Sequence, residues 1–286
     1  MQHRLAAIVN KPATERHDKL SLPTRVAFLP LAVVTAILGP VLVLFPDDTR
    51  DYWSWPIAPD MSAVWVGAGY TFGAIAITTM LVQGRSSASL VAIGGTWPFS
   101  IVMLAATIIH NDRFFTDTAG YYVWLAIYLF LPFALPPLLW LELRNDPGRH
   151  TTDLLLPSWL RWSLVAAGAL AAMIGVVMVL DPAILDQSWP WLLTPLLSRV
   201  IGGWLLFIGA GGLAALVETR YVAYRYYLVA ATVWFSVLFV ASLLNSNDFD
   251  ADRLATPLYF IAVGGAVVAI ASMFVYMERL AKSRPS

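Results

Sequence analysis

Polar residues that could bind a cation gather where two apolar segments end. Asn111 and Asp112 follow the segment that ends near residue 110, and Asn247, Asp248 and Asp250 follow the one that ends near residue 245. Carboxylate and carbonyl oxygens are the ligands that Ca²⁺ prefers, and the alternate spacing of Asp248 and Asp250 resembles the start of a calcium-binding loop. The sharp-turn glycine and the closing glutamate of such a loop are absent from the sequence. The pattern predicts capped helix ends beside a solvated acidic loop, with a cation site as the alternative.

Two loops on the same side of the predicted fold carry tryptophan next to proline. Trp55 precedes Pro56, and Trp189 precedes Pro190. Tryptophan favours the lipid–water boundary, where its ring is buried and its N–H stays hydrated. The two loops are therefore expected to form an aromatic belt, and the alternative is a ligand pocket that they build together on that face.

A single arginine falls about one turn inside an apolar segment. Arg199 is expected to pair with a carboxylate of the neighbouring loops, with Asp186 and Asp248 as the leading partners. An unpaired guanidinium at that depth would otherwise have to extend its charge toward the membrane surface.

Several kinds of chemistry are excluded by what the chain lacks. It has no cysteine and four histidines, none of them placed so that two could meet inside the apolar segments. Thiol chemistry, cysteine–metal sites and a bis-histidine haem are therefore not expected. No lysine lies inside an apolar segment, so a Schiff-base cofactor has no attachment point. We expect no metal, no cofactor and no catalytic residue.

The composition indicates that lipid is the solvent for most of the chain. Of the 286 residues, 59% are hydrophobic and only 13% are charged, whereas a soluble domain carries about 25% charged residues. The net charge is zero, so nothing favours nucleic acid as a partner. The expected partners are the lipid bilayer and either a lipophilic ligand or another membrane subunit.

Eight apolar stretches are long enough to cross a bilayer core, which takes about 20 helical residues. Short polar segments separate them, and none alternates as a barrel strand would. The fold class is therefore an all-α polytopic membrane protein whose eight transmembrane helices are predicted at 25–46, 61–83, 88–110, 119–142, 158–180, 196–217, 225–245 and 256–278.

Basic residues predict the orientation. With eight crossings both termini lie on one side, and 14 of the 18 Lys and Arg fall there, leaving Arg50, Arg113, Arg199 and Arg253. Positive charge collects on the cytoplasmic side of membrane proteins. We expect a multi-pass protein of the cell (inner) membrane of a bacterium, with both termini cytoplasmic.

The chain matches itself when it is shifted by 136 residues. Segment 58–114 aligns without a gap on 194–250, and the pairs Gly73/Gly209 and Asn111/Asn247 are identical. This predicts two parallel four-helix repeats related by a pseudo-twofold axis along the membrane normal. The expected organisation is a polar cytoplasmic segment 1–22, a first repeat 23–142, a linker 143–157, a second repeat 158–280 and a tail 281–286.

Features inside the spans suggest how the repeats would pack. Glycines cluster in the second and sixth spans, which are expected to meet at the axis because small residues let helices approach closely. Three prolines in the fourth span, Pro132, Pro136 and Pro137, predict a bend. The glutamates at three span ends, Glu142, Glu218 and Glu278, are expected to form ion pairs that are solvated or lie at headgroup level, with Arg144, Arg220 and Arg279 nearby.

Two kinds of function fit these observations best. The first is a non-enzymatic membrane protein, either a structural or accessory subunit or a binder of a lipophilic ligand. The alternative is a transporter or channel for a small solute or ion that uses the axis between the repeats. A membrane enzyme is a third interpretation, for which only the Asn–Asp corners offer clustered polar groups. A closely packed, dry axis would favour the first interpretation and a water-filled one the second.

Overall fold

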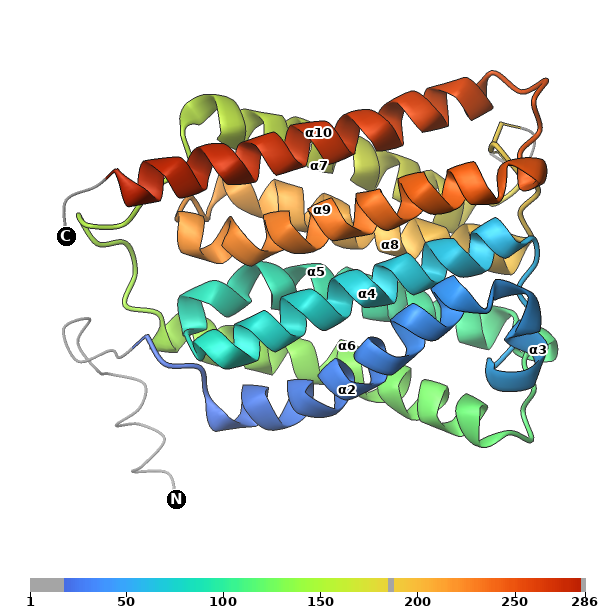
Figure 1. Cartoon of the computed structure of the whole chain (residues 1–286). Coiled ribbons are helices and arrows are strands. Elements are labelled where there is room, and N and C mark those ends of the chain that lie inside the picture. Colours follow the sequence, from blue (N-terminus) through green and yellow to red (C-terminus); the bar gives the residue numbers. More distant parts are fainter. Residues whose placement is uncertain (1–17, 185–187, 284–286) are drawn as a thin grey trace.

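Eight long helices make up most of the protein in a computed structural model that describes residues 18–184 and 188–283 (Figure 1). All eight are long and apolar enough to cross a membrane, which confirms the prediction of eight helices of this kind. The described residues contain no β-strand. The helices are α2 (Leu22–Leu44), α4 (Asp60–Gln83), α5 (Ser86–Ile109), α6 (Ala119–Asn145), α7 (Ser158–Leu180), α8 (Pro195–Leu213), α9 (Tyr221–Leu244) and α10 (Ala255–Lys282).

Local side chains explain where several helices begin and end. The hydroxyls of Ser21, Thr118 and Thr194 each accept a hydrogen bond from the backbone N–H three residues on, and so cap α2, α6 and α8. Gly84 ends α4 with φ of 61°, a conformation that glycine adopts without a steric penalty. A one-turn helix, α3 (Thr49–Tyr52), lies in the loop between α2 and α4.

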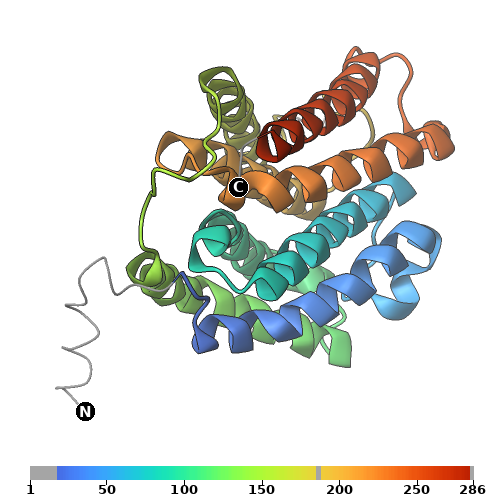
Figure 2. The same cartoon turned by 60° about the vertical axis from the view of Figure 1, so that its left-hand side comes forward.

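The first four long helices (α2, α4, α5 and α6) lie on one side of the molecule and the last four (α7 to α10) on the other, and we call them the first and the second group (Figures 1 and 2). In the first group α2 packs on α4 and α6 packs on α5, while in the second α7 packs on α8 and α10 packs on α9. The groups meet where α5 contacts α8 and α4 contacts α9. The start of α2 and the end of α10 lie on one side of the molecule, which we call the terminal side, and the opposite side is the distal side.

The glycines of α4 and α8 mainly serve contacts within each group. A Cβ atom at Gly67 would lie 2.7 Å from Cβ of Leu42 in α2, and one at Gly209 would lie 2.7 Å from Cβ of Ala172 in α7. The expectation that these glycines bring the second and sixth spans together is therefore wrong for most of them. Gly69 is an exception, because it faces the ring of Trp204 in α8.

Aromatic rings fill the contact between the two groups. Phe72 of α4 lies 5.2 Å from Phe207 of α8 and 5.5 Å from Trp234 of α9, measured between ring centroids. Trp204 lies 5.7 Å from Trp234. All four side chains are buried, and their edge-to-face geometry is the one that aromatic pairs favour.

The segment between α6 and α7 is fastened to the loop between α8 and α9. The N–H of Leu156 donates to the carbonyl of Thr219, and the N–H of Tyr221 donates to that of Leu154. Arg220 donates through both terminal nitrogens to Asp146, at 2.7 and 2.6 Å, and also bonds Glu218. Because the Arg220 side chain is only 7% exposed, the Glu218 pair is buried and not solvated as the sequence had predicted.

Candidate functional site

A cavity of about 340 Å³ lies in the first group of helices. Side chains from α2, α4, α5 and α6 line it, together with Trp204 and Phe207 of α8 and the residues at the end of α3. Its inner wall includes the buried rings of Tyr70, Phe99 and Tyr128. Its size falls at the lower end of the range for small-molecule sites, and its lining is almost entirely carbon.

The cavity opens between α2 and α6. Each of these helices packs on an inner neighbour, and within the described residues they form no extended interface with each other. Ile37 of α2 and Val123 of α6 both line the cavity, yet their side chains are 58% and 52% exposed. The opening therefore lies on the apolar flank of the helices and not at a polar end of the bundle.

The three prolines of α6 are accommodated within one continuous helix. Proline has no N–H, so Pro136 cannot bond the carbonyl of Pro132 four residues earlier. The indole N–H of Trp97 in α5 donates to that carbonyl at 3.1 Å. A side chain of the neighbouring helix thus satisfies the carbonyl group that Pro136 leaves without its helical donor.

Aromatic rings along the inner wall of the cavity contact one another. The hydroxyls of Tyr70 and Tyr128 lie 3.0 Å apart. Trp53 packs edge-on against Tyr70 at 5.8 Å and against Trp124 at 5.6 Å. The indole N–H groups of Trp53 and Trp204 are buried without a hydrogen-bond partner among the described residues, and neither reaches an accessible surface.

A fully buried carboxylate joins α2, α5 and α6 on the terminal side. Glu142 accepts hydrogen bonds at 2.6 Å from the hydroxyls of Ser21, Thr24 and Ser86, and at 3.2 Å from the N–H of Ser21. Within the described residues no cation pairs with it, and Arg144 lies instead over the ring of Trp140. The expectation of a solvated ion pair is therefore wrong for Glu142. Its hydroxyl partners are far away in the sequence, and no local pattern pointed to them.

The corresponding residue of the second group has a different environment. Glu278 in α10 accepts hydrogen bonds from Arg225 at 2.7 and 2.9 Å and from the hydroxyl of Tyr221 at 2.9 Å. The predicted ion pair exists, but its partner lies on α9 and not at the adjacent Arg279. The side chain of Glu278 is 20% exposed.

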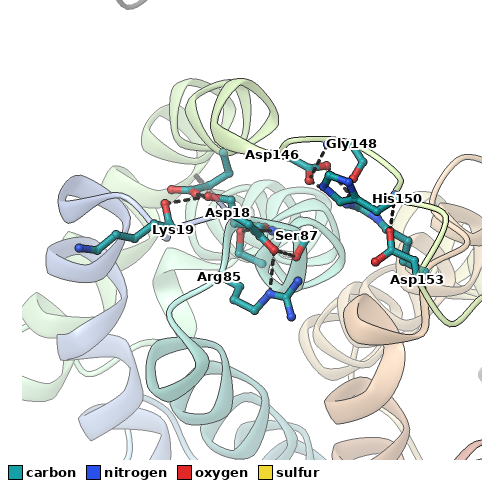
Figure 3. A network of polar contacts seen from close by, with 12 residues as sticks. Asp18, Lys19, Arg85, Ser87, Asp146, Gly148, His150 and Asp153 are labelled. Atoms are coloured by element: carbon teal, nitrogen blue, oxygen red, sulfur yellow. Dashed lines mark hydrogen bonds and ion pairs between the residues drawn. The ribbon is translucent and has the colours of Figure 1, made fainter. Parts of the chain in front are cut away.

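A second carboxylate beside the first group, Asp18, lies close to the start of α5 (Figure 3). It accepts hydrogen bonds from the N–H and hydroxyl of Ser87, at 2.8 and 2.6 Å, and from Arg85 at 2.7 Å. Burial of Asp18 alone would raise its pKa, but the bonds from Ser87 and Arg85 outweigh it and hold the pKa below the ordinary value. This contact fixes the segment before α2 against α5.

Arg199 has a different partner from the one predicted. Its guanidinium lies 2.7 Å from Nε2 of His110, which follows α5, and also bonds the carbonyl of Pro195. Asp248 instead accepts a hydrogen bond from the N–H of Met61 at the start of α4, so the proposed Arg199–Asp248 pair is wrong. The other predicted partner, Asp186, lies outside the described residues. Burial of His110, together with the charge of Arg199, lowers the histidine pKa.

The Asn–Asp corners do not form one site. Asn111 accepts a hydrogen bond from the hydroxyl of Tyr121 at 2.6 Å, and the exposed Asp112 pairs with Arg113. At the other corner Asp250 pairs with Arg253. Asn247 is exposed. The first corner thus contacts its own helix connection through Tyr121 and Arg113, whereas the second also reaches the start of α4 through Asp248.

The two tryptophan loops also differ from the prediction. Trp55 is 1% exposed and packs against Trp124 at 4.9 Å, so it belongs to the interior and not to a belt. Trp189 is half-buried and packs on Trp191. Among the described residues of the two loops, those that line the cavity belong to the first, namely Trp53 and its neighbours. The two loops therefore do not build that cavity together.

No protein-family model, curated protein or solved structure matches the chain.

Proposed function

We propose that this chain is a non-enzymatic multi-pass membrane protein that binds a lipophilic molecule in the cavity between α2 and α6. The observation that carries the proposal is a volume of about 340 Å³ with an apolar lining and an opening on an apolar flank. A ligand that dissolves in the bilayer can reach such an opening without crossing water. A role as an accessory subunit is compatible with this binding.

We further propose that the two groups of helices are parallel repeats related by a pseudo-twofold axis along the membrane normal. Under the shift of 136 residues α4 corresponds to α8 and α5 to α9. The contact of α5 with α8 then corresponds to that of α9 with α4, and both contacts are present. The pairing of α2 with α4 likewise corresponds to that of α7 with α8.

The alternative, a solute pathway along the axis between the repeats, is less well supported. Phe72, Trp204 and Trp234 pack edge to face where the two groups meet. A path for a polar solute needs hydrogen-bonding or charged groups along it. Buried rings in direct contact do not supply them.

We also propose that the terminal side is cytoplasmic and that the protein resides in the inner membrane of a bacterium. The positive-inside tendency supports this orientation. Because the chain has no cysteine, single variants Asp153→Cys and Asp250→Cys would each carry one thiol. A membrane-impermeant maleimide added to intact cells should label only the second variant, and labelling of the first alone would reverse the orientation.

The binding proposal can be tested with a small photoreactive aryl diazirine that partitions into bilayers. Photolabelling of the purified protein in nanodiscs should modify Tyr128, which is 3% exposed. Gly73 lines the cavity, and a Cβ there would lie 3.5 Å from Thr35, an ordinary contact. Gly73→Leu should therefore fill the cavity and reduce labelling of Tyr128 on the order of tenfold, the effect of about 1.4 kcal/mol.

Gly265→Leu is the matched control for this substitution. Gly265 is exposed on α10, and nothing lies within 4 Å of a Cβ placed there. Labelling of Tyr128 in this variant should equal that of the wild type. If Tyr128 is not labelled in the wild-type protein, or is labelled equally in Gly73→Leu, the cavity does not bind lipophilic molecules.

A further inference from the structure

The cavity is elongated along the helices that border it. On α6 its lining residues extend from Ala119 to Leu131, twelve positions, or about 18 Å at the helical rise of 1.5 Å per residue. Ala119 is the first residue of α6 at the distal side, where Tyr52 and Ser54 also line the cavity. A bilayer core is about 30 Å thick, so this length is close to that of one leaflet. The cavity therefore extends from the distal boundary to about the middle of the membrane.

Three of the hydroxyl groups along the cavity, those of Thr35, Thr96 and Tyr52, already donate to backbone carbonyls. Thr35 donates to the carbonyl of Leu31, and Thr96 donates to that of Ala92, each at 2.7 Å. Tyr52 donates to the carbonyl of Phe45 at 2.6 Å. A polar ligand group placed deep in the cavity would lose its hydrogen bonds to water, and these three hydroxyls have no free donor to replace them. This lining favours a ligand whose inserted part is pure hydrocarbon.

From this shape and lining we infer that the cavity holds one acyl chain of a phospholipid from the distal leaflet. The chain enters sideways between Ile37 and Val123, and the headgroup stays at the distal boundary beside α3. This inference rests on the proposed function and adds the class of ligand and its route. A compact ring compound could occupy the same volume, but its binding would not require a cavity of this length or one with a lateral opening.

The inference predicts that a lipid in the bilayer reaches residues that bulk lipid cannot contact. The probe is a phosphatidylcholine with a diazirine at the middle of one acyl chain, mixed into phosphatidylcholine vesicles that contain the full-length protein. After irradiation, mass spectrometry should find adducts on Ile77 and Tyr128, which are 7% and 3% exposed. Phe133, which is 74% exposed on α6, should be modified in every variant and reports correct insertion.

Two kinds of variant test the entry route and the cavity interior separately. Ile37→Trp combined with Val123→Trp narrows the opening and should reduce labelling of Ile77 and Tyr128 by the lipid about tenfold, while labelling of Phe133 persists. Gly73→Leu should have the same effect by filling the interior. Ala76→Leu serves as a second filling variant, because Ala76 lines the cavity on the same helix.

The small aryl diazirine distinguishes this inference from the proposed function. If that compound labels Tyr128 in the wild type and the phosphatidylcholine probe does not, the cavity binds lipophilic molecules but not lipid chains, and the inference is overturned. If neither probe labels Tyr128, the proposed function itself fails. If lipid labelling survives the narrowed opening, the chain does not enter between α2 and α6.

Discussion

Two glutamates occupy equivalent places in the two groups of helices and are held in opposite ways. Glu142 and Glu278 lie 136 residues apart, each near the terminal-side end of the fourth long helix of its group. Glu142 is completely buried among hydroxyl groups. Glu278 is partly exposed and is paired with the guanidinium of Arg225. The glutamate therefore accepts hydrogen bonds from neutral hydroxyls in the first group and forms an ion pair in the second.

The difference has an electrostatic basis. Ser21 caps α2 and Ser86 is the first residue of α5, so two of the three hydroxyl partners of Glu142 lie at helix N-termini. The positive end of a helix dipole stabilises a nearby anion, and hydrogen bonds to a charged group are stronger than neutral ones. Glu142 can thus remain buried without a cation. It joins three helices at the terminal side of the cavity, whereas Glu278 joins only α9 and α10.

Removing the carboxylate of Glu142 should give the largest effect. Glu142→Ala removes the acceptor that the Ser21, Thr24 and Ser86 hydroxyls share, and each lost bond to a charged group is worth about 1.5–3 kcal/mol. We expect a loss of at least about 3 kcal/mol in the free energy of unfolding, measured by thermal unfolding in detergent or nanodiscs. A loss near zero would show that the hydroxyl groups do not depend on the carboxylate.

Glu142→Gln should lower the free energy of unfolding by less than half as much as Glu142→Ala. The amide oxygen still accepts hydrogen bonds, and its NH₂ group can donate to Ser86, whose hydroxyl lies 3.0 Å from the carbonyl of Lys19 and can donate there instead. The variant loses the negative charge and the favourable geometry of one hydrogen bond. We expect this to lower the free energy of unfolding by about 1–1.5 kcal/mol. The same thermal unfolding measurement checks this, and equal losses for Gln and Ala would contradict the importance of hydrogen bonding.

Glu278→Ala should destabilise the protein only slightly. The pair with Arg225 is partly solvated, and exposed pairs contribute about 0.2–1 kcal/mol. A double-mutant cycle with Arg225→Ala measures the coupling directly. If the coupling exceeded the loss found for Glu142→Ala, the contrast between the two groups would be reversed.

The contact between Arg199 and His110 should produce the smallest effect, and it depends on pH. The pKa of His110 is lower in the folded protein than its ordinary value of 6.5, so the unfolded chain takes up its proton first as the pH falls. Stability from this residue is therefore complete above about pH 6.5 and declines as the pH falls toward the folded pKa.

His110→Gln, which cannot titrate, is the control for this prediction. The difference in unfolding temperature between wild type and variant should shrink between about pH 7 and pH 5 as the wild type loses stability. A difference that stays constant over this range would show that the histidine remains unperturbed. Arg199→Ala should weaken the pH dependence, because the cation contributes to the lowered pKa.

The amino-acid sequence by itself determined the eight helices and most of their ends. The preference of an apolar side chain for lipid over water does not depend on where its helix lies in the fold. Runs of such residues therefore predict the membrane-spanning helices. Capping is also local, as at Ser21 and Gly84, because the interacting groups lie within a few positions of one another.

Only the tertiary structure decided which residues meet and where space remains. The cavity brings together Thr35, Tyr70, Tyr128 and Trp204, which come from four different helices. Glu142 bonds Ser21 across 121 positions, and Arg199 meets His110 across 89. Helix faces that contact lipid and helix faces that contact other helices are both apolar. Hydropathy therefore does not distinguish one kind of face from the other. Partners and voids instead follow from how side chains fit between helices, as Trp55 shows because its ring is buried against Trp124 and does not face lipid.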